Sequence, residues 1–175
     1  MAQEFETRVL DIDVKKIEDK LTKLGAKVED EVLMKRWVFD IDGPNQQWIR
    51  LRDNGKKVTI AYKNRTGSGI SETEELEVEV SDFEESAKIL SKLKFKETFY
   101  QENKRKIFLL NDIEFAIDTW PKIPPYLEIE SDSEEKVKEG LALLGLQGKD
   151  VGNISVKETY DRYGVKLHSF KELRF

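Results

Sequence analysis

Charged side chains of one sign recur at every second position in several short segments of this 175-residue chain. Residues two apart share a face of a β-strand, so each such run would place its charges side by side. The acidic runs are Glu75, Glu77 and Glu79, and Glu128 with Glu130; the basic runs are Arg50 with Arg52, and Lys63 with Arg65. Carboxylates can hold hard divalent cations, and guanidinium or ammonium groups bind phosphate oxygens.

The composition excludes several other chemistries. The chain has no cysteine and a single histidine, His168, so disulfides, thiolate catalysis and Cys- or His-rich metal sites are excluded, and carboxylates remain as metal ligands. We assign His168, which lies in the C-terminal tail, no catalytic role. The net charge of −5 offers no attraction for nucleic acid or an anionic membrane. No apolar run is long enough to span a bilayer and the first residues do not resemble a signal segment, so we predict a soluble cytoplasmic protein.

Alternating and helical spacings predict an α+β fold in a single domain over residues 1–175, with a core of about 3–163 and a loosely held tail at 164–175. Asp13 and the pair Ser81 with Glu84 would begin the first two helices, and the third would follow Ser131, Asp132 and Ser133. Gly25 and Gly145 would end the first and the third. Eight strands are predicted at 3–10, 32–40, 47–53, 57–65, 72–80, 97–110, 112–119 and 125–131. Short turns at 42–45, 53–55 and 111–112 favour antiparallel pairing. We expect a loop at 145–153 and a last strand at 154–160.

Six of these strands have one apolar and one charged face. A charged face is often simply solvated, because antiparallel sheets commonly bury only one side. Here, however, whole strands carry one sign, and like charges on one face repel unless a counter-charge or ligand lies between the strands. Three one-sided helices could cover the apolar face, and a curled sheet would then turn the charged face inward. An eight-stranded barrel has room inside for one small ligand. Such a lumen suits a ligand with phosphates of its own, together with a divalent cation.

The order of these motifs resembles the CYTH superfamily, the triphosphate tunnel metalloenzymes, which includes class IV adenylyl cyclases and thiamine triphosphatases. The opening Glu-x-Glu-x-Lys motif of that family is similar to Glu4-Phe-Glu6-Thr-Arg8. The family's later strand motifs are matched by Arg50-Leu-Arg52, Lys63-Asn-Arg65, the acidic run at 75–79, Asn103-Lys-Arg105, Asp118 and Tyr126-Leu-Glu128-Ile-Glu130. Its basic residue before an aromatic residue near the C-terminus is similar to Lys157 before Tyr160. The resemblance covers nearly the whole chain, from residue 3 to about 163. It implies an eight-stranded, mostly antiparallel β-barrel with a charged lumen and about three helices outside.

The resemblance also implies the roles of individual residues. The catalytic residues would be Glu4, Glu6 and Arg8. Substrate phosphates would be bound by Arg8, Arg50, Arg52, Lys63, Arg65, Arg105 and Lys157. The metal ligands for Mg²⁺ or Mn²⁺ would come from Glu4, Glu6, Glu77, Glu79, Asp118, Glu128 and Glu130. Two departures stand out: Arg8 replaces a lysine and cannot act as a general base near neutral pH, and Asn103 replaces the first lysine of the sixth-strand pair.

Three functions remain open on the sequence. We favour an adenylyl cyclase-like enzyme, which would convert ATP to cyclic AMP and pyrophosphate. An inorganic or thiamine triphosphatase, in which water attacks the terminal phosphorus, is the alternative. A non-catalytic module that binds a polyphosphate or nucleotide is the third. In each case the partner is a small-molecule triphosphate rather than nucleic acid or a membrane, and the sequence does not indicate an oligomeric state. A lipocalin-like barrel is disfavoured because charged residues stand where its lumen would be apolar.

Overall fold

The computed structural model describes residues 5–41, 47–65, 73–95 and 97–175. The strands are β1 (Phe5–Val9), β2 (Lys27–Val28), β3 (Val32–Asp40), β4 (Gln47–Asp53), β5 (Val58–Arg65), β6 (Thr73–Val80), β7 (Glu97–Leu110), β8 (Ile113–Thr119), β9 (Tyr126–Ser131) and β10 (Glu172–Leu173). The helices are α1 (Val14–Lys23), α2 (Phe83–Ser91), α3 (Glu134–Leu144), α4 (Val156–Arg162) and the short 3₁₀ helix η1 (Leu167–Ser169). The predicted α+β class is confirmed.

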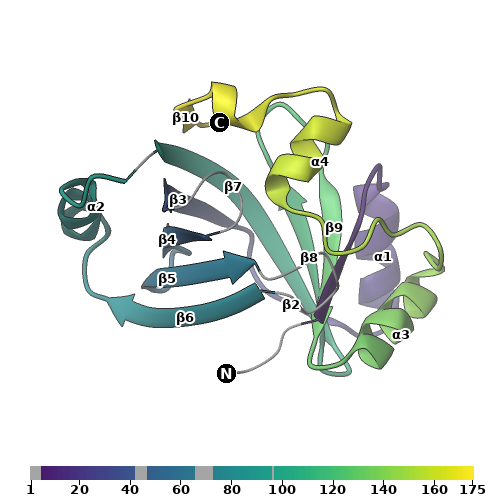
Figure 1. The fold of residues 1–175 in the computed structure, drawn as a ribbon. Coiled ribbons are helices and arrows are strands. Elements are labelled where there is room, and N and C mark those ends of the chain that lie inside the picture. Colours follow the sequence, from purple (N-terminus) through teal and green to yellow (C-terminus); the bar gives the residue numbers. More distant parts are fainter. Residues whose placement is uncertain (1–4, 42–46, 66–72, 96) are drawn as a thin grey trace.

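Eight strands form one curled sheet in the order β1-β9-β8-β7-β3-β4-β5-β6, and each neighbouring pair is antiparallel. The two short strands both add to β7, β2 antiparallel and β10 parallel. Figure 1 shows the sheet as a half-barrel, with β8 and β9 on one side and β5 and β6 on the other. The predicted eight-stranded, mostly antiparallel architecture is therefore confirmed.

The convex face of the sheet carries most of the apolar core. Helices α1 and α3 cover it at β1, β8 and β9, where Leu127 and Ile129 are fully buried with Leu141 of α3. Helix α2 covers it at β3 and β4, where Leu51 packs in one cluster with Phe83. Side chains alternate along a strand, so the charged neighbours of these residues face the concave side.

The helix ends follow the sequence signals closely. Asp13 caps α1, and Gly25, just beyond its end, has the positive φ of 83° that glycine tolerates. Ser133 caps α3. The expected start of the second helix at Ser81 is wrong by one residue, because the Asp82 carboxylate accepts the capping hydrogen bond. Among the described helices, none is long and apolar enough to cross a membrane.

Two of the predicted turns join neighbouring antiparallel strands. The turn predicted at 53–55 falls at the end of β4 and in the connection of residues 54–57 to β5. Asn111 and Asp112 connect β7 to β8 with φ values of 54° and 60°. Positive φ at both central residues matches the right-handed twist of the flanking strands. The predicted turn at 42–45 lies outside the described residues.

The prediction of a last strand at 154–160 is wrong, because these residues begin helix α4. Ser155 and Glu158 form a reciprocal capping box, and the Tyr160 hydroxyl donates a 2.7 Å hydrogen bond to the carbonyl of Pro121. The tail is not loosely held either. Strand β10 pairs with β7, and Leu173 is 1% exposed in a buried cluster. A fourth helix and a docked tail therefore add to the three predicted helices; Figure 1 shows them across the top of the half-barrel.

Candidate functional site

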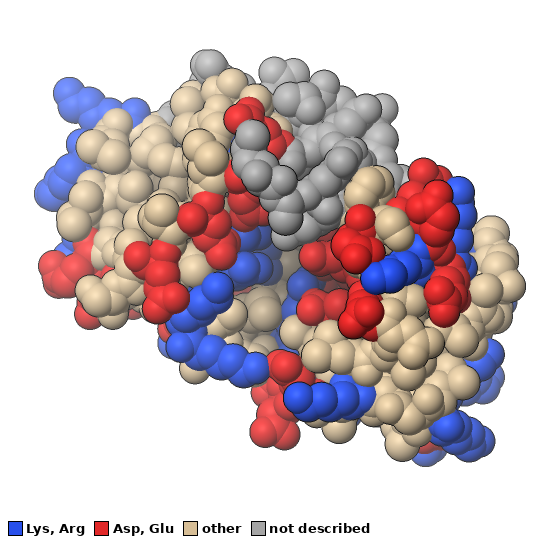
Figure 2. Space-filling view, turned by 90° about the horizontal axis from the view of Figure 1, so that it is seen from below, with Lys and Arg blue, Asp and Glu red and all other residues tan. Residues whose placement is uncertain are grey.

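The concave face of the sheet encloses a cavity of about 610 Å³. Among the described residues, seven basic and eight acidic side chains line it. Figure 2 shows blue and red side chains meeting in the hollow near the centre of one face of the molecule. The predicted charged lumen is present, and its two signs of charge are nearly balanced.

One wall of the cavity is built from β4, β5 and β6. Arg50 Nη2 lies 3.0 Å from a carboxylate oxygen of Glu75 and 3.3 Å from one of Glu77, while Arg52 lies 3.6 Å from Glu77. The Lys63 ammonium is 2.7 Å from Glu75. The basic side chains of β4 and β5 are thus paired with the acidic side chains of β6. This pairing offsets the repulsion between like charges along each strand.

The opposite wall is a buried ion network on β1, β7, β8 and β9. Arg105 Nη2 contacts Asp118 at 2.6 Å and Glu128 at 2.7 Å, and Arg8 Nη2 contacts Glu128 at 2.8 Å. Burial by itself would raise the pKa of Glu128, but Arg105 and Arg8 lower it to about 2. Glu128 is therefore ionised at any pH of physiological interest. The guanidinium of Arg8 also donates a hydrogen bond to the carbonyl of Ile154, in the segment that leads into α4.

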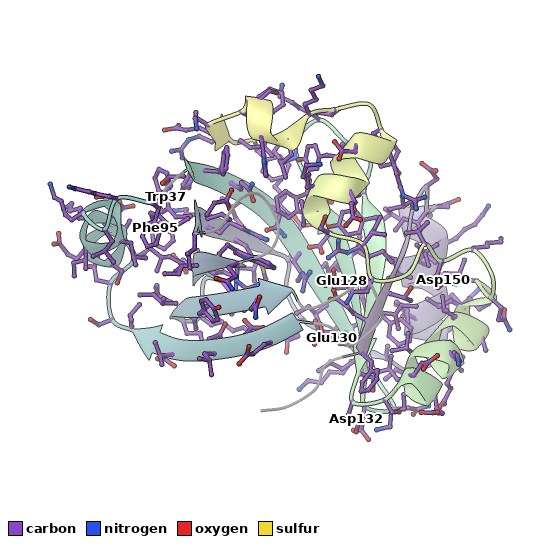
Figure 3. All side chains as sticks on the ribbon, viewed as in Figure 1. Trp37, Phe95, Glu128, Glu130, Asp132 and Asp150 are labelled. Atoms are coloured by element: carbon purple, nitrogen blue, oxygen red, sulfur yellow. The ribbon has the colours of Figure 1, made fainter. Side chains whose placement is uncertain are left out.

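Three carboxylates gather beside this network. Glu6, Glu128 and Glu130 each offer an oxygen atom within 4.8 Å of the others. Burial and the charge of Glu128 raise the pKa of Glu6 to about 7. Figure 3 labels Glu128 and Glu130 along β9, facing the space toward β5 and β6 that forms the cavity. Such an oxygen-rich, electronegative group fits a hard divalent cation.

Most of the predicted site residues meet in this one cavity. Its lining includes Glu6, Arg8, Arg50, Arg52, Lys63, Glu77, Arg105, Asp118, Glu128, Glu130 and Lys157. Asp118 lies apart from the carboxylate trio as the buried counter-ion of Arg105. Lys157 pairs at 2.6 Å with Asp161 of its own helix.

Three predicted residues are not among those that the structure brings together. Glu79 is exposed on β6 and does not line the cavity. Glu4 and the side chain of Arg65 lie outside the part of the chain that the structure describes. The roles assigned to these three residues remain predictions.

Several lining residues were missed by the sequence reasoning. Arg36 of β3 and Glu114 of β8 both line the cavity, and burial raises the pKa of Glu114. The signal for Arg36 was weak, because Lys35 and Arg36 give charge to both faces of their strand. Trp48 of β4 also lines the cavity, and so does His168, whose ring stacks on Phe99 at 4.5 Å.

The fold and the site together define a class: a curled antiparallel sheet whose concave face encloses paired acidic and basic side chains. The sequence model of the CYTH domain matches residues 2–154. The chain therefore belongs to the CYTH family, as the motif order indicated. A comparison with curated proteins gives no significant match.

Solved structures agree with this assignment. The PH1012 protein of Pyrococcus horikoshii OT3 is 25% identical with a TM-score of 0.72, over 84% of this chain and 93% of that one. A candidate adenylate cyclase of Vibrio parahaemolyticus is 14% identical with a TM-score of 0.70, over 91% and 98% of the two chains. The candidate adenylyl cyclase HpAC1 of Hippeastrum, described as having a dominant triphosphatase activity, is 18% identical with a TM-score of 0.61, over 95% and 98%. The last two likenesses show a shared fold.

Proposed function

We propose that this CYTH protein is a metal-dependent enzyme that acts on a triphosphate inside the cavity, and that its reaction is the conversion of ATP to cyclic AMP and pyrophosphate. The observation that carries the proposal is the cavity itself, in which seven basic and eight acidic side chains of the described residues face one another. Neither a bare polyanion nor a bare cation complements such a lining. A triphosphate bound together with a divalent cation matches both kinds of wall.

Glu6, Glu128 and Glu130 are the residues that would hold Mg²⁺ or Mn²⁺. Their oxygens already lie within 4.8 Å of one another, and their mutual repulsion is what a cation would relieve. When bound, the ion would supply positive charge to the phosphate oxygens. We keep Glu4 as a further ligand on the resemblance alone.

Phosphate oxygens would be held by Arg8, Arg50, Arg52, Lys63 and Arg105. Arginine offers two parallel N–H donors to a phosphate, and lysine offers a compact charge. In phosphoryl chemistry the protein mainly positions groups and neutralises charge, so no covalent nucleophile is required. Salt bridges hold these cations in place, so a bound triphosphate would compete with carboxylates already paired to them.

Apolar side chains scattered among the charged groups of the lining favour a nucleoside triphosphate over inorganic triphosphate. They are Met34, Val38, Trp48 and Ile107. The volume of about 610 Å³ lies within the range of about 300–1,000 Å³ that is usual for small-molecule sites. In the cyclisation the ribose 3′-oxygen would attack the α-phosphorus, the bond to the β-phosphate oxygen would break, and pyrophosphate would leave.

Hydrolysis of the terminal phosphate, in which water attacks the terminal phosphorus, is the second candidate. HpAC1, which shares the fold, is described as having a dominant triphosphatase activity. Both reactions would use the same phosphate-binding residues and differ in how the substrate is oriented.

The test is to incubate the protein with ATP, thiamine triphosphate and inorganic triphosphate, each with Mg²⁺ or Mn²⁺, and to separate the products by chromatography. Cyclic AMP with pyrophosphate supports the cyclase, and ADP or diphosphate with phosphate supports the triphosphatase. Binding by calorimetry without any product indicates a non-catalytic module. No binding of any metal–triphosphate contradicts the proposal. Arg50→Gln should lose the activity that Lys23→Gln, on the exposed surface of α1, retains.

A further inference from the structure

Arg36 occupies a central place in the cavity wall. On β3 it lies opposite Arg52 of β4 on one side and Gln101 of β7 on the other. Its guanidinium lies 4.5 Å from the centre of the Trp120 ring, and both side chains line the cavity. Arg36 therefore links the Arg50–Arg52 wall to the wall that contains Arg105.

The other arginines of the cavity have carboxylate partners. Arg8 and Arg105 contact Glu128, and Arg50 and Arg52 contact Glu77. Within the described residues, no carboxylate oxygen lies within salt-bridge distance of Arg36, whose contacts are a neutral amide and an aromatic ring. The guanidinium is thus a partly buried positive charge without a direct counter-ion.

Unpartnered donors occur in the same region. Among the described side chains, Arg36 Nε, Arg50 Nε and Trp120 Nε1 are buried N–H groups without a hydrogen-bond partner, and all three residues line the cavity. Leaving a buried donor unpaired is costly, by about 1–3 kcal/mol. A ligand with many acceptor oxygens and negative charge would satisfy these groups together.

Asn103 orients the guanidinium of Arg36. Asn103 is fully buried; its Oδ1 accepts a hydrogen bond from Arg36 Nη2, and its Nδ2 donates one of 2.9 Å to Asp118. A lysine at position 103 would instead place a second positive charge against Arg36. The neutral side chain at 103 and the arginine at 36 are therefore compatible as a pair, and the positive charge that the sequence lacks at 103 is present on the adjacent strand.

We infer that Arg36 is a substrate-binding residue of this cavity and takes a phosphate oxygen of the bound triphosphate, a role that rests on the proposed function. It joins two groups of cations that lie on different strands, so it suits an extended phosphate chain rather than a single phosphate. Arg36 would supply, from the neighbouring strand β3, the positive charge that the lysine-to-Asn103 replacement removes from β7.

The test is isothermal titration calorimetry of inorganic triphosphate with Mn²⁺ into the full chain. Arg36→Gln should weaken binding ten- to a hundred-fold, as expected for loss of a charged hydrogen bond. Arg36→Lys, which keeps the charge without the forked donors, should show a smaller loss. The matched control is Lys35→Gln, which removes the same charge from the exposed, convex side of the same strand and should leave affinity unchanged.

Thermal melting of the free protein separates binding from a structural role. Arg36→Gln should melt at the same temperature as the parent or higher, because it removes a partly buried charge that has no counter-ion and whose Nε donor is unpaired. A lower melting temperature with unchanged affinity overturns the inference, and so does an affinity for both Arg36 variants equal to that of Lys35→Gln. If Arg36→Gln does not fold, an affinity of Arg36→Lys equal to that of the parent is enough to overturn the inference. If the parent itself binds no metal–triphosphate, both the proposed function and the inference about Arg36 are wrong.

Discussion

The protonation of Glu6 should make the stability of this protein depend on pH in a defined window. Burial and the neighbouring Glu128 raise the pKa of Glu6 from 4.5 to about 7. Between these two values the folded protein keeps a proton that the unfolded chain has already released. Stability from this group is therefore fully present below pH 4.5 and is lost as the pH rises through 7.

The size of the effect follows from the two pKa values. The difference corresponds to at most about 3 kcal/mol of folding free energy. The side chain of Glu6 is 25% exposed, and water screens part of its interactions, so we expect about 2 kcal/mol. Glu128 affects stability in a separate pH window. Because its pKa is lowered from 4.5 to about 2, the stability that it contributes is lost as the pH falls from 4.5 to 2.

The perturbation is Glu6→Gln, which mimics the protonated side chain at every pH. Urea unfolding followed by circular dichroism, without metal, should give the variant and the parent similar stability at pH 4, below both pKa values of Glu6. At pH 8 the variant should be more stable by about 2 kcal/mol. Glu31→Gln, which changes an exposed loop carboxylate, is the control and should follow the parent throughout. A variant that is no more stable than the parent at pH 8 would refute the assigned environment of Glu6.

Three further predictions concern the walls of the cavity and α4. Mn²⁺ and triphosphate at saturating concentration should raise the melting temperature of the parent and of Lys23→Gln but not of Arg50→Gln. A ligand at 100 times its dissociation constant stabilises the folded state by about 2.7 kcal/mol. An equal rise in Arg50→Gln contradicts the phosphate site. Asp118→Asn, which leaves Arg105 paired with Glu128, should lower the unfolding free energy in urea by about 1.5–3 kcal/mol, and a loss below about 1 kcal/mol would show that the ion pair is dispensable. Ser155→Ala should cost about 1 kcal/mol in the same assay through the lost helix cap, which an unchanged midpoint would disprove.

The faces of the strands could be predicted because alternation is a local property of extended backbone. Once residues 75–79 or 128–130 are strands, Leu127 and Glu128 must point to opposite sides. The apolar stripes of the helices then leave one face for the core, and the charged residues must share the other. The start of α1 was equally predictable, because Asp13 caps the helix through a hydrogen bond to Lys16, three residues on.

The C-terminal region could not be assigned in this way. Residues 154–160 alternate in polarity as a strand would, but the capping box of Ser155 and Glu158 and the burial of Tyr160 against Pro121 favour a helix. The contact with Pro121 joins residues 39 positions apart. Only the folded sheet brings that partner close enough to decide between the two conformations.

Within the site, side-chain alternation along each strand specifies which residue types face the cavity, whereas the arrangement of the strands specifies which of them meet. Glu6, Glu128 and Glu130 converge because β1 pairs with β9, whereas Glu79, in an equally regular acidic run, stays exposed. Arg36 enters the cation wall because β3 lies between β4 and β7. Side-chain alternation repeats within a strand and can be read from neighbours, but strand order and curl depend on contacts between distant residues, which no local pattern contains.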